Sequence, residues 1–247
     1  MRPPTDHPLA TPLRRPLLPT LRPALVMLAG VVAGAASFIP SVGWTTSALS
    51  LQSVTISPAD VPLGRRTTGT VTISPTRALS TIQLASLNRS IATVPSSVTV
   101  AGGQTSSAFA VRTGTSVPGC TDITATMGGI TKRATIFVLP LPTPSSAPVR
   151  VTVPPSAVGG QTVQGRVGLL GVTAGTHTVR LSSSNPNVVS VPASVTVSAT
   201  QNEVTVSGSS SFPITTSTVG NTQCAVITAT FNGTTSKALI KVFSISG

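Results

Sequence analysis

The two cysteines, Cys120 and Cys224, are the side chains of this sequence whose placement points most clearly to chemistry. Each opens a run of the same kind, CTDITAT after the first and CAVITAT after the second. If Ile123 and Ala125 point into a core, strand alternation puts Cys120 on the outer face, and Cys224 likewise. The pair could form a disulfide within the chain, form disulfides to other chains, or stay as free thiols. The sequence leaves these three alternatives open.

The other titratable side chains are too few for a known catalytic arrangement. Past residue 36 the chain has His177, Asp60, Asp122 and Glu203, and it has no tyrosine. A nucleophile needs a base and an orienting acid beside it, and glycoside hydrolysis needs paired carboxylates. His177 has the parity of the apolar residues that follow it, so we expect a buried or edge histidine. The sequence therefore predicts no catalytic residues, no metal site, no cofactor and no enzymatic activity.

The charge is strongly basic, with 16 Lys and Arg against 4 Asp and Glu and a net charge of +12. Past residue 36 there remain 12 basic and 3 acidic residues, a net charge of +9. Such a balance favours anionic partners. The basic residues are scattered, however, and the chain has one Trp, six Phe and no Tyr for stacking on bases. We therefore expect no nucleic-acid partner and keep anionic glycans or envelope polymers as the alternative.

The first 50 residues have the organisation of an export signal. Residues 1–23 are rich in Pro and Arg, residues 24–39 are uncharged and mostly apolar, and small residues follow. Residues 24–44 are also long enough to remain as a membrane anchor. Both interpretations put the rest of the chain outside the cytoplasm, either secreted or at the cell surface.

Two copies of one unit follow this segment. The heptapeptide VPSSVTV at 94–100 returns as VPASVTV at 191–197, which is 97 positions later, whereas the cysteines are 104 positions apart. The second copy therefore has seven extra residues before its cysteine. Four prolines in residues 140–148 predict a stiff linker. The predicted organisation is a leader (1–50), a first domain (51–139), the linker (140–148) and a second domain (149–247).

Each copy consists of short alternating runs separated by turn residues. Asn232-Gly233 and Gly128-Gly129 lie between the last two runs of each copy and predict hairpins. About seven short strands in some 95 residues predict an all-β fold with two tandem immunoglobulin-like β-sandwiches. The runs are 52–57, 67–74, 80–86, 91–94, 97–100, 106–112, 121–127 and 131–138 in the first copy, and 149–153, 162–169, 176–182, 188–191, 194–197, 202–207, 225–231 and 235–243 in the second.

Two stretches of the second copy resemble the bacterial Ig-like domains found in tandem on secreted and surface proteins. They are LSSSNPNVVSVP at 181–192 and ITATFNG at 227–233, and the first copy is more diverged at 84–92. The resemblance implies spacers, adhesin stalks or binding accessories. We expect a non-enzymatic structural or adhesive module whose partner is a protein or polysaccharide of the cell envelope. Modules strung end to end would hold equivalent cysteines tens of ångströms apart, whereas a bridge needs Cα atoms within about 7 Å.

Overall fold

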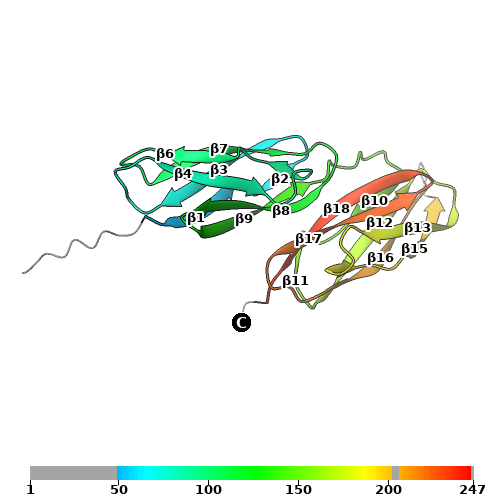
Figure 1. Cartoon of the computed structure of the whole chain (residues 1–247). Coiled ribbons are helices and arrows are strands. Elements are labelled where there is room, and N and C mark those ends of the chain that lie inside the picture. Colours follow the sequence, from blue (N-terminus) through cyan, green and yellow to red (C-terminus); the bar gives the residue numbers. More distant parts are fainter. Residues whose placement is uncertain (1–48, 202–205, 246–247) are drawn as a thin grey trace, which may run out of the picture. The chain divides into compact units, whose positions relative to one another are not determined.

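The computed structural model describes residues 49–201 and 206–245, and all the regular elements in these two ranges are β-strands (Figure 1). The predicted all-β fold is thus confirmed. The candidate signal or anchor at 24–44 and Glu203 lie outside the described residues. Within the described ranges, no helix has the length and apolar character needed to cross a membrane.

The first sandwich is formed by the strands between Leu51 and Leu139. One sheet has the order β1-β3-β7-β5 and the other has the order β2-β9-β8-β4-β6. Neighbouring strands are antiparallel except for β2, which runs parallel to β9. The strands are β1 (Leu51–Ser57), β2 (Asp60–Pro62), β3 (Arg66–Ile73), β4 (Ser80–Ser86), β5 (Ala92–Thr93), β6 (Ser97–Val100), β7 (Ser106–Thr113), β8 (Gly119–Met127) and β9 (Ile130–Leu139).

The second sandwich repeats this arrangement from Val149 to Phe243. Its strands follow the order β10-β12-β16-β15-β13-β17-β18-β11, with β14 beside β16. The strands are β10 (Val149–Thr152), β11 (Ser156–Val158), β12 (Thr162–Leu170), β13 (Gly175–Ser183), β14 (Val189–Ser190), β15 (Ser194–Gln201), β16 (Val206–Thr216), β17 (Gln223–Phe231) and β18 (Thr234–Phe243). Both sandwiches belong to one compact unit.

The extra residues of the second copy lengthen β15 and β16. These strands pair with each other at Thr200↔Ser207 and Gln201↔Val206 and so join the two sheets, which are separate in the first sandwich. The predicted runs at 194–197 and 202–207 were therefore wrong in their bounds. Residues 207–211 are Ser-Gly-Ser-Ser-Ser, which carry no strand signal of their own. They are extended because β12 pairs with them along its length, and such pairing overrides local propensity.

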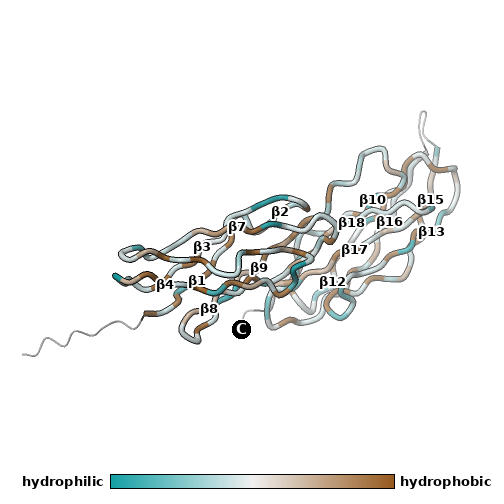
Figure 2. Tube along the Cα trace, turned by 45° about the horizontal axis from the view of Figure 1, so that its top comes forward, coloured by the Kyte–Doolittle hydropathy of each residue, from teal (hydrophilic) through white to brown (hydrophobic). Residues whose placement is uncertain are grey.

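Each sandwich has its own hydrophobic core, formed by the inward positions of its strands. Along the strands in Figure 2, hydrophobic positions alternate with more hydrophilic ones. Fully buried branched residues form the centres of both cores. They are Val71, Ile82, Val111, Ile123 and Ile136 in the first sandwich, and Val167, Val179, Ile214, Ile227 and Ile240 in the second.

A glycine and a phenylalanine face each other at the same place in both cores. Gly69 lies opposite Phe109, and Gly165 lies opposite Phe212. A Cβ atom on Gly69 would lie 2.1 Å from Phe109 Cζ, and one on Gly165 would lie 2.4 Å from Phe212 Cζ. The ring therefore occupies the space that a side chain would need, so any larger residue at either position would have to displace the ring.

The last residue of β7 and of β16 is a buried threonine. Its hydroxyl bonds the loop before the neighbouring strand, which is β3 in the first sandwich and β12 in the second. Thr216 Oγ1 accepts a hydrogen bond from the Gln161 amide at 3.0 Å and lies 3.0 Å from the Val158 carbonyl oxygen. Thr113 repeats this geometry with the Arg65 amide at 2.9 Å and the Pro62 carbonyl oxygen at 2.9 Å. Thr113 and Thr216 are 8 % and 3 % exposed, so water does not replace these bonds.

The Thr216→Val variant is expected to lower the free energy of unfolding by about 0.5–1.5 kcal/mol, because it removes the buried hydroxyl that bonds the Gln161 amide and the Val158 carbonyl oxygen. Urea denaturation measures this change. The matched control is Thr68→Val, since Thr68 is exposed on β3 and valine suits a strand. Equal effects of the two substitutions would contradict the role assigned to the Thr216 hydroxyl.

Candidate functional site

The two sandwiches are joined by a disulfide between equivalent strands. Cys120 on β8 and Cys224 on β17 are bonded, with their Cα atoms 6.1 Å apart, and neither is a free thiol. Of the three alternatives that the sequence left open, the structure has the bridge within the chain. The large separation expected for modules strung end to end does not occur, because the outer faces of β8 and β17 contact each other.

An apolar cluster surrounds the disulfide. Phe137, Cys224, Val226 and Leu239 are buried in it, and Ala59, Cys120 and Leu139 pack against them. Val226 and Leu239 are cross-strand partners on the outer face of their own sandwich, yet they are only 4 % and 8 % exposed. Residues of the first sandwich therefore provide much of the cover that these two side chains need.

An ion pair lies at the edge of the same contact. Lys241 Nζ of β18 is 2.7 Å from Oδ2 of Asp60, which belongs to β2 of the first sandwich. The same nitrogen lies 4.4 Å from the centroid of the Phe137 ring. The Lys241 side chain is 18 % exposed and that of Asp60 is 49 % exposed, so the cation is largely enclosed while the carboxylate reaches solvent.

Equivalent positions of the two copies meet across this contact. Cys120 and Cys224 are equivalent by sequence, and their cross-strand partners, Phe137 and Lys241, are equivalent as well. Two pairs of equivalent positions thus meet across the contact, Cys120 with Cys224 and Phe137 with Lys241. The ion pair is not repeated in this way, because the residue equivalent to Asp60 is Ser156.

The Lys241→Gln variant is expected to lower the free energy of unfolding, measured by thermal denaturation, by about 0.5–1 kcal/mol. It removes a partly exposed ion pair and a cation–π contact, each of which contributes little in water. The effect should shrink at 1 M salt because salt screens the ion pair. The exposed Lys132 gives the matched control, Lys132→Gln. A salt-independent loss for Lys241→Gln would contradict the ionic part of this assignment.

The other candidate residues from the sequence are placed apart from one another. His177 Nε2 lies 2.7 Å from the Thr173 carbonyl oxygen, and its ring meets that of Phe231 edge-on at 5.5 Å. His177 is half-buried on β13, a strand that lies between β15 and β17, so it is neither fully buried nor on an edge strand. Among the described residues, no group of three or more His, Cys, Asp or Glu side chains could hold a metal ion.

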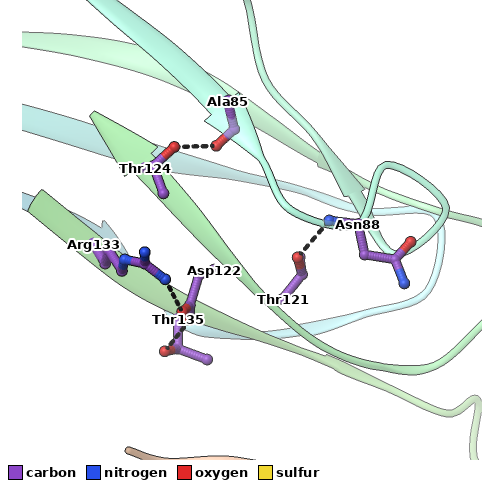
Figure 3. Close-up of polar contacts among 7 residues, drawn as sticks. All are labelled: Ala85, Asn88, Thr121, Asp122, Thr124, Arg133 and Thr135. Atoms are coloured by element: carbon purple, nitrogen blue, oxygen red, sulfur yellow. Dashed lines mark hydrogen bonds and ion pairs between the residues drawn. The ribbon is translucent and has the colours of Figure 1, made fainter. Parts of the chain in front are cut away.

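Asp122 lies on the outer face of β8 and takes part in a small polar network. It accepts a hydrogen bond from Thr135 Oγ1 at 2.7 Å, and Arg133 Nη1 lies 3.8 Å from its other oxygen (Figure 3). The hydroxyl of Thr121 accepts a hydrogen bond from the Asn88 amide at 2.9 Å and fixes the turn after β4. The contacts of Asp122 stabilise the surface of the sheet, and the buried Thr121 hydroxyl holds the turn, so neither group lies beside a nucleophile and base.

The strand order and the two packed sheets of each copy establish the fold class. The chain carries two tandem immunoglobulin-like sandwiches. No family model and no curated protein matches the chain. Among solved structures it is similar to the D0-D1 domain of intimin, at 11 % identity over 79 % of this chain and 99 % of that one, with a TM-score of 0.37.

Two further solved structures are similar to the sandwich pair. They are domains 5-6 of the S-layer protein SbsC (16 % identity, 80 % of this chain and 100 % of that one, TM-score 0.28) and the Yersinia pseudotuberculosis adhesin InvE (15 % identity, 78 % of this chain and 58 % of that one, TM-score 0.30).

Sequence reasoning did not identify the apolar residues that surround the disulfide. A signal was present, however, in the outward positions of the second copy. Val226 and Leu239 stand there at positions that Asp122 and Thr135 occupy in the first copy. An outward pair of large apolar residues beside a cysteine indicates a covered surface.

Proposed function

We propose that this chain is a non-enzymatic structural module of the cell envelope, in which two Ig-like sandwiches are held together as one rigid spacer or interaction surface. The observation that carries the proposal is the disulfide between Cys120 and Cys224. Disulfides persist in oxidising compartments, which supports a location outside the cytoplasm.

The contact between the two sandwiches limits their motion relative to each other. Two domains joined by a short linker move relative to each other unless their interface is extensive. In this chain the disulfide fixes one point of the contact, and the apolar cluster and the Asp60–Lys241 ion pair restrict rotation about it. A spacer holds whatever it carries at a constant distance and orientation, so it benefits from such a clamp.

Distance measurements between spin labels test this proposal. Labels are attached through unnatural amino acids at two exposed positions, Thr55 of the first sandwich and Gln164 of the second, so that no cysteine is added. A narrow distance distribution is expected in the oxidised protein and a broad one in the Cys120→Ser/Cys224→Ser variant. A label pair at Thr55 and Thr81, both in the first sandwich, serves as the control and should not change. A broad distribution in the oxidised protein would rule out the rigid spacer.

The redox state in the native cell is tested by alkylation. Cells are lysed in denaturant that contains iodoacetamide, so that any free thiol is alkylated at once. The intact mass of the protein is expected to show no added alkyl group without reduction and two after reduction. Two alkyl groups without prior reduction would show that the bridge does not form in the cell, and would contradict the proposed oxidising location.

A further inference from the structure

The outer face of the sheet β1-β3-β7-β5 carries small side chains and two arginines. Register places three rows of residues on this face, and apart from the arginines each is Ser, Thr or Ala. The small residues are Ser53, Thr55 and Ser57 on β1, Thr68, Thr70 and Thr72 on β3, and Ser106, Ala108 and Ala110 on β7. Arg66 and Arg112 stand at one end, and both are exposed.

The two arginines are direct cross-strand partners. Arg66 on β3 pairs with Arg112 on β7, which brings the bases of the two side chains within about 5.5 Å of each other. Like charges placed directly opposite destabilise a sheet. The acids within the described residues are Asp60 and Asp122, and these are paired with Lys241 and Arg133. No described carboxylate therefore neutralises the arginine pair.

Two open depressions lie beside the arginines, one bordered by Arg66 and the other by Arg112. One, of about 410 Å³, is lined by Arg66, Thr68, Ala108 and Ala110 among others. A second, of about 240 Å³, is lined by Arg112, Ala110 and the segment 93–95. Ala110 borders both depressions, so they adjoin. The methyl groups of Ala108 and Ala110 leave room above the sheet that larger side chains would fill.

We propose that Arg66 and Arg112 form a binding site for the sulfate or carboxylate groups of an acidic polysaccharide. Two guanidinium groups on adjacent strands can each grip an oxyanion through a planar fork of donors. The Ser and Thr hydroxyls along the same face supply donors and acceptors for sugar hydroxyls. The face has no exposed aromatic ring on which a nucleobase could stack, which favours a polysaccharide over single-stranded nucleic acid. This site goes beyond the structural role and does not depend on the disulfide.

Binding of the full chain to immobilised polymers tests the site, with dextran sulfate, polygalacturonate, neutral dextran and single-stranded DNA as probes. The Arg66→Ala/Arg112→Ala variant is expected to lose at least about 10-fold in affinity for an acidic polysaccharide. The slope of log affinity against log salt concentration should become less steep by about two, because two fewer counterions are released on binding. Dextran sulfate and polygalacturonate distinguish sulfate from carboxylate as the preferred group, and either one supports the site.

The matched control removes the same charge from positions where arginines are not opposed. Arg166→Ala/Arg180→Ala removes two exposed arginines on different strands, β12 and β13, and should change affinity less than about 2-fold if the opposed pair binds the polymer. The Arg66→Gln/Arg112→Gln variant repeats the test with more soluble side chains, in case the alanine variant folds poorly. Equal losses in both double variants would overturn the site in favour of net charge alone. Absence of wild-type binding to both acidic polymers at 20 mM salt, or equally tight binding of single-stranded DNA, would also overturn it.

Discussion

The Cys120→Ser/Cys224→Ser variant is expected to unfold in two separate transitions, whereas the oxidised protein unfolds in one coupled transition at a higher temperature. Each sandwich has its own core, so each can remain folded alone once the clamp is lost. The bridge closes a loop with a sequence separation of 104 residues. In the chain-entropy model, a loop of that length stabilises the folded state by about 4–5 kcal/mol. Calorimetry of the two proteins measures both effects.

Reduction of the wild-type protein provides the internal control, because it should reproduce the serine variant without any change of sequence. The far-ultraviolet circular dichroism of the reduced protein should still show β-structure. A single unshifted transition after reduction would mean that the disulfide contributes nothing to the coupling between the sandwiches. Loss of all β-structure would mean that the separate cores are insufficient.

The Phe212→Ala variant is expected to lower the free energy of unfolding of the second sandwich by about 3–5 kcal/mol. Phe212 is 1 % exposed, and its removal leaves a cavity that the surrounding sheet cannot close. The opposite change, Gly165→Ala, should cost about 1–3 kcal/mol because the new methyl group overlaps the ring. Urea denaturation of each variant measures these values.

The double variant Gly165→Ala/Phe212→Ala separates a steric cause from a general loss of stability. Without the ring, the added methyl group has more space, so the double variant should be more stable than the sum of the single effects predicts by about 1–2 kcal/mol. Gly69 and Phe109 form the matched pair in the first sandwich and should show the same coupling. Strict additivity in both sandwiches would contradict the assigned packing.

Most of the strands could be predicted from the sequence because inward apolar residues alternate with outward polar residues along them. The run at 121–127, for example, places Ile123, Ala125 and Met127 on one face, and β8 buries all three. The three-residue strands β2 and β11 could not be predicted in this way, because three residues are too few to show alternation and both strands are defined by parallel pairing with a distant strand. Register with a neighbour, rather than local sequence, determines such elements.

The state of the cysteines could not be decided from the sequence for a related reason. Their outward parity was predicted correctly, and β8 and β17 have that parity. A disulfide, however, depends on which outer faces of two domains contact each other, and that contact is long-range. The arginine pair on the outer face was hidden for the same reason, because Arg66 and Arg112 are 46 positions apart and meet only through the register of β3 with β7.

The contact between equivalent positions also affects how this surface can change over generations. In a domain that pairs with an identical copy, a substitution appears on both sides at once, so a lysine at the position of Lys241 would face another lysine. With both copies in one chain, each side varies independently, and here Lys241 faces Phe137 while Asp60 holds the cation from one side alone. A chain with two covalently joined copies can therefore acquire an asymmetric ion pair. A dimer of identical copies would place two lysines opposite each other at the same position.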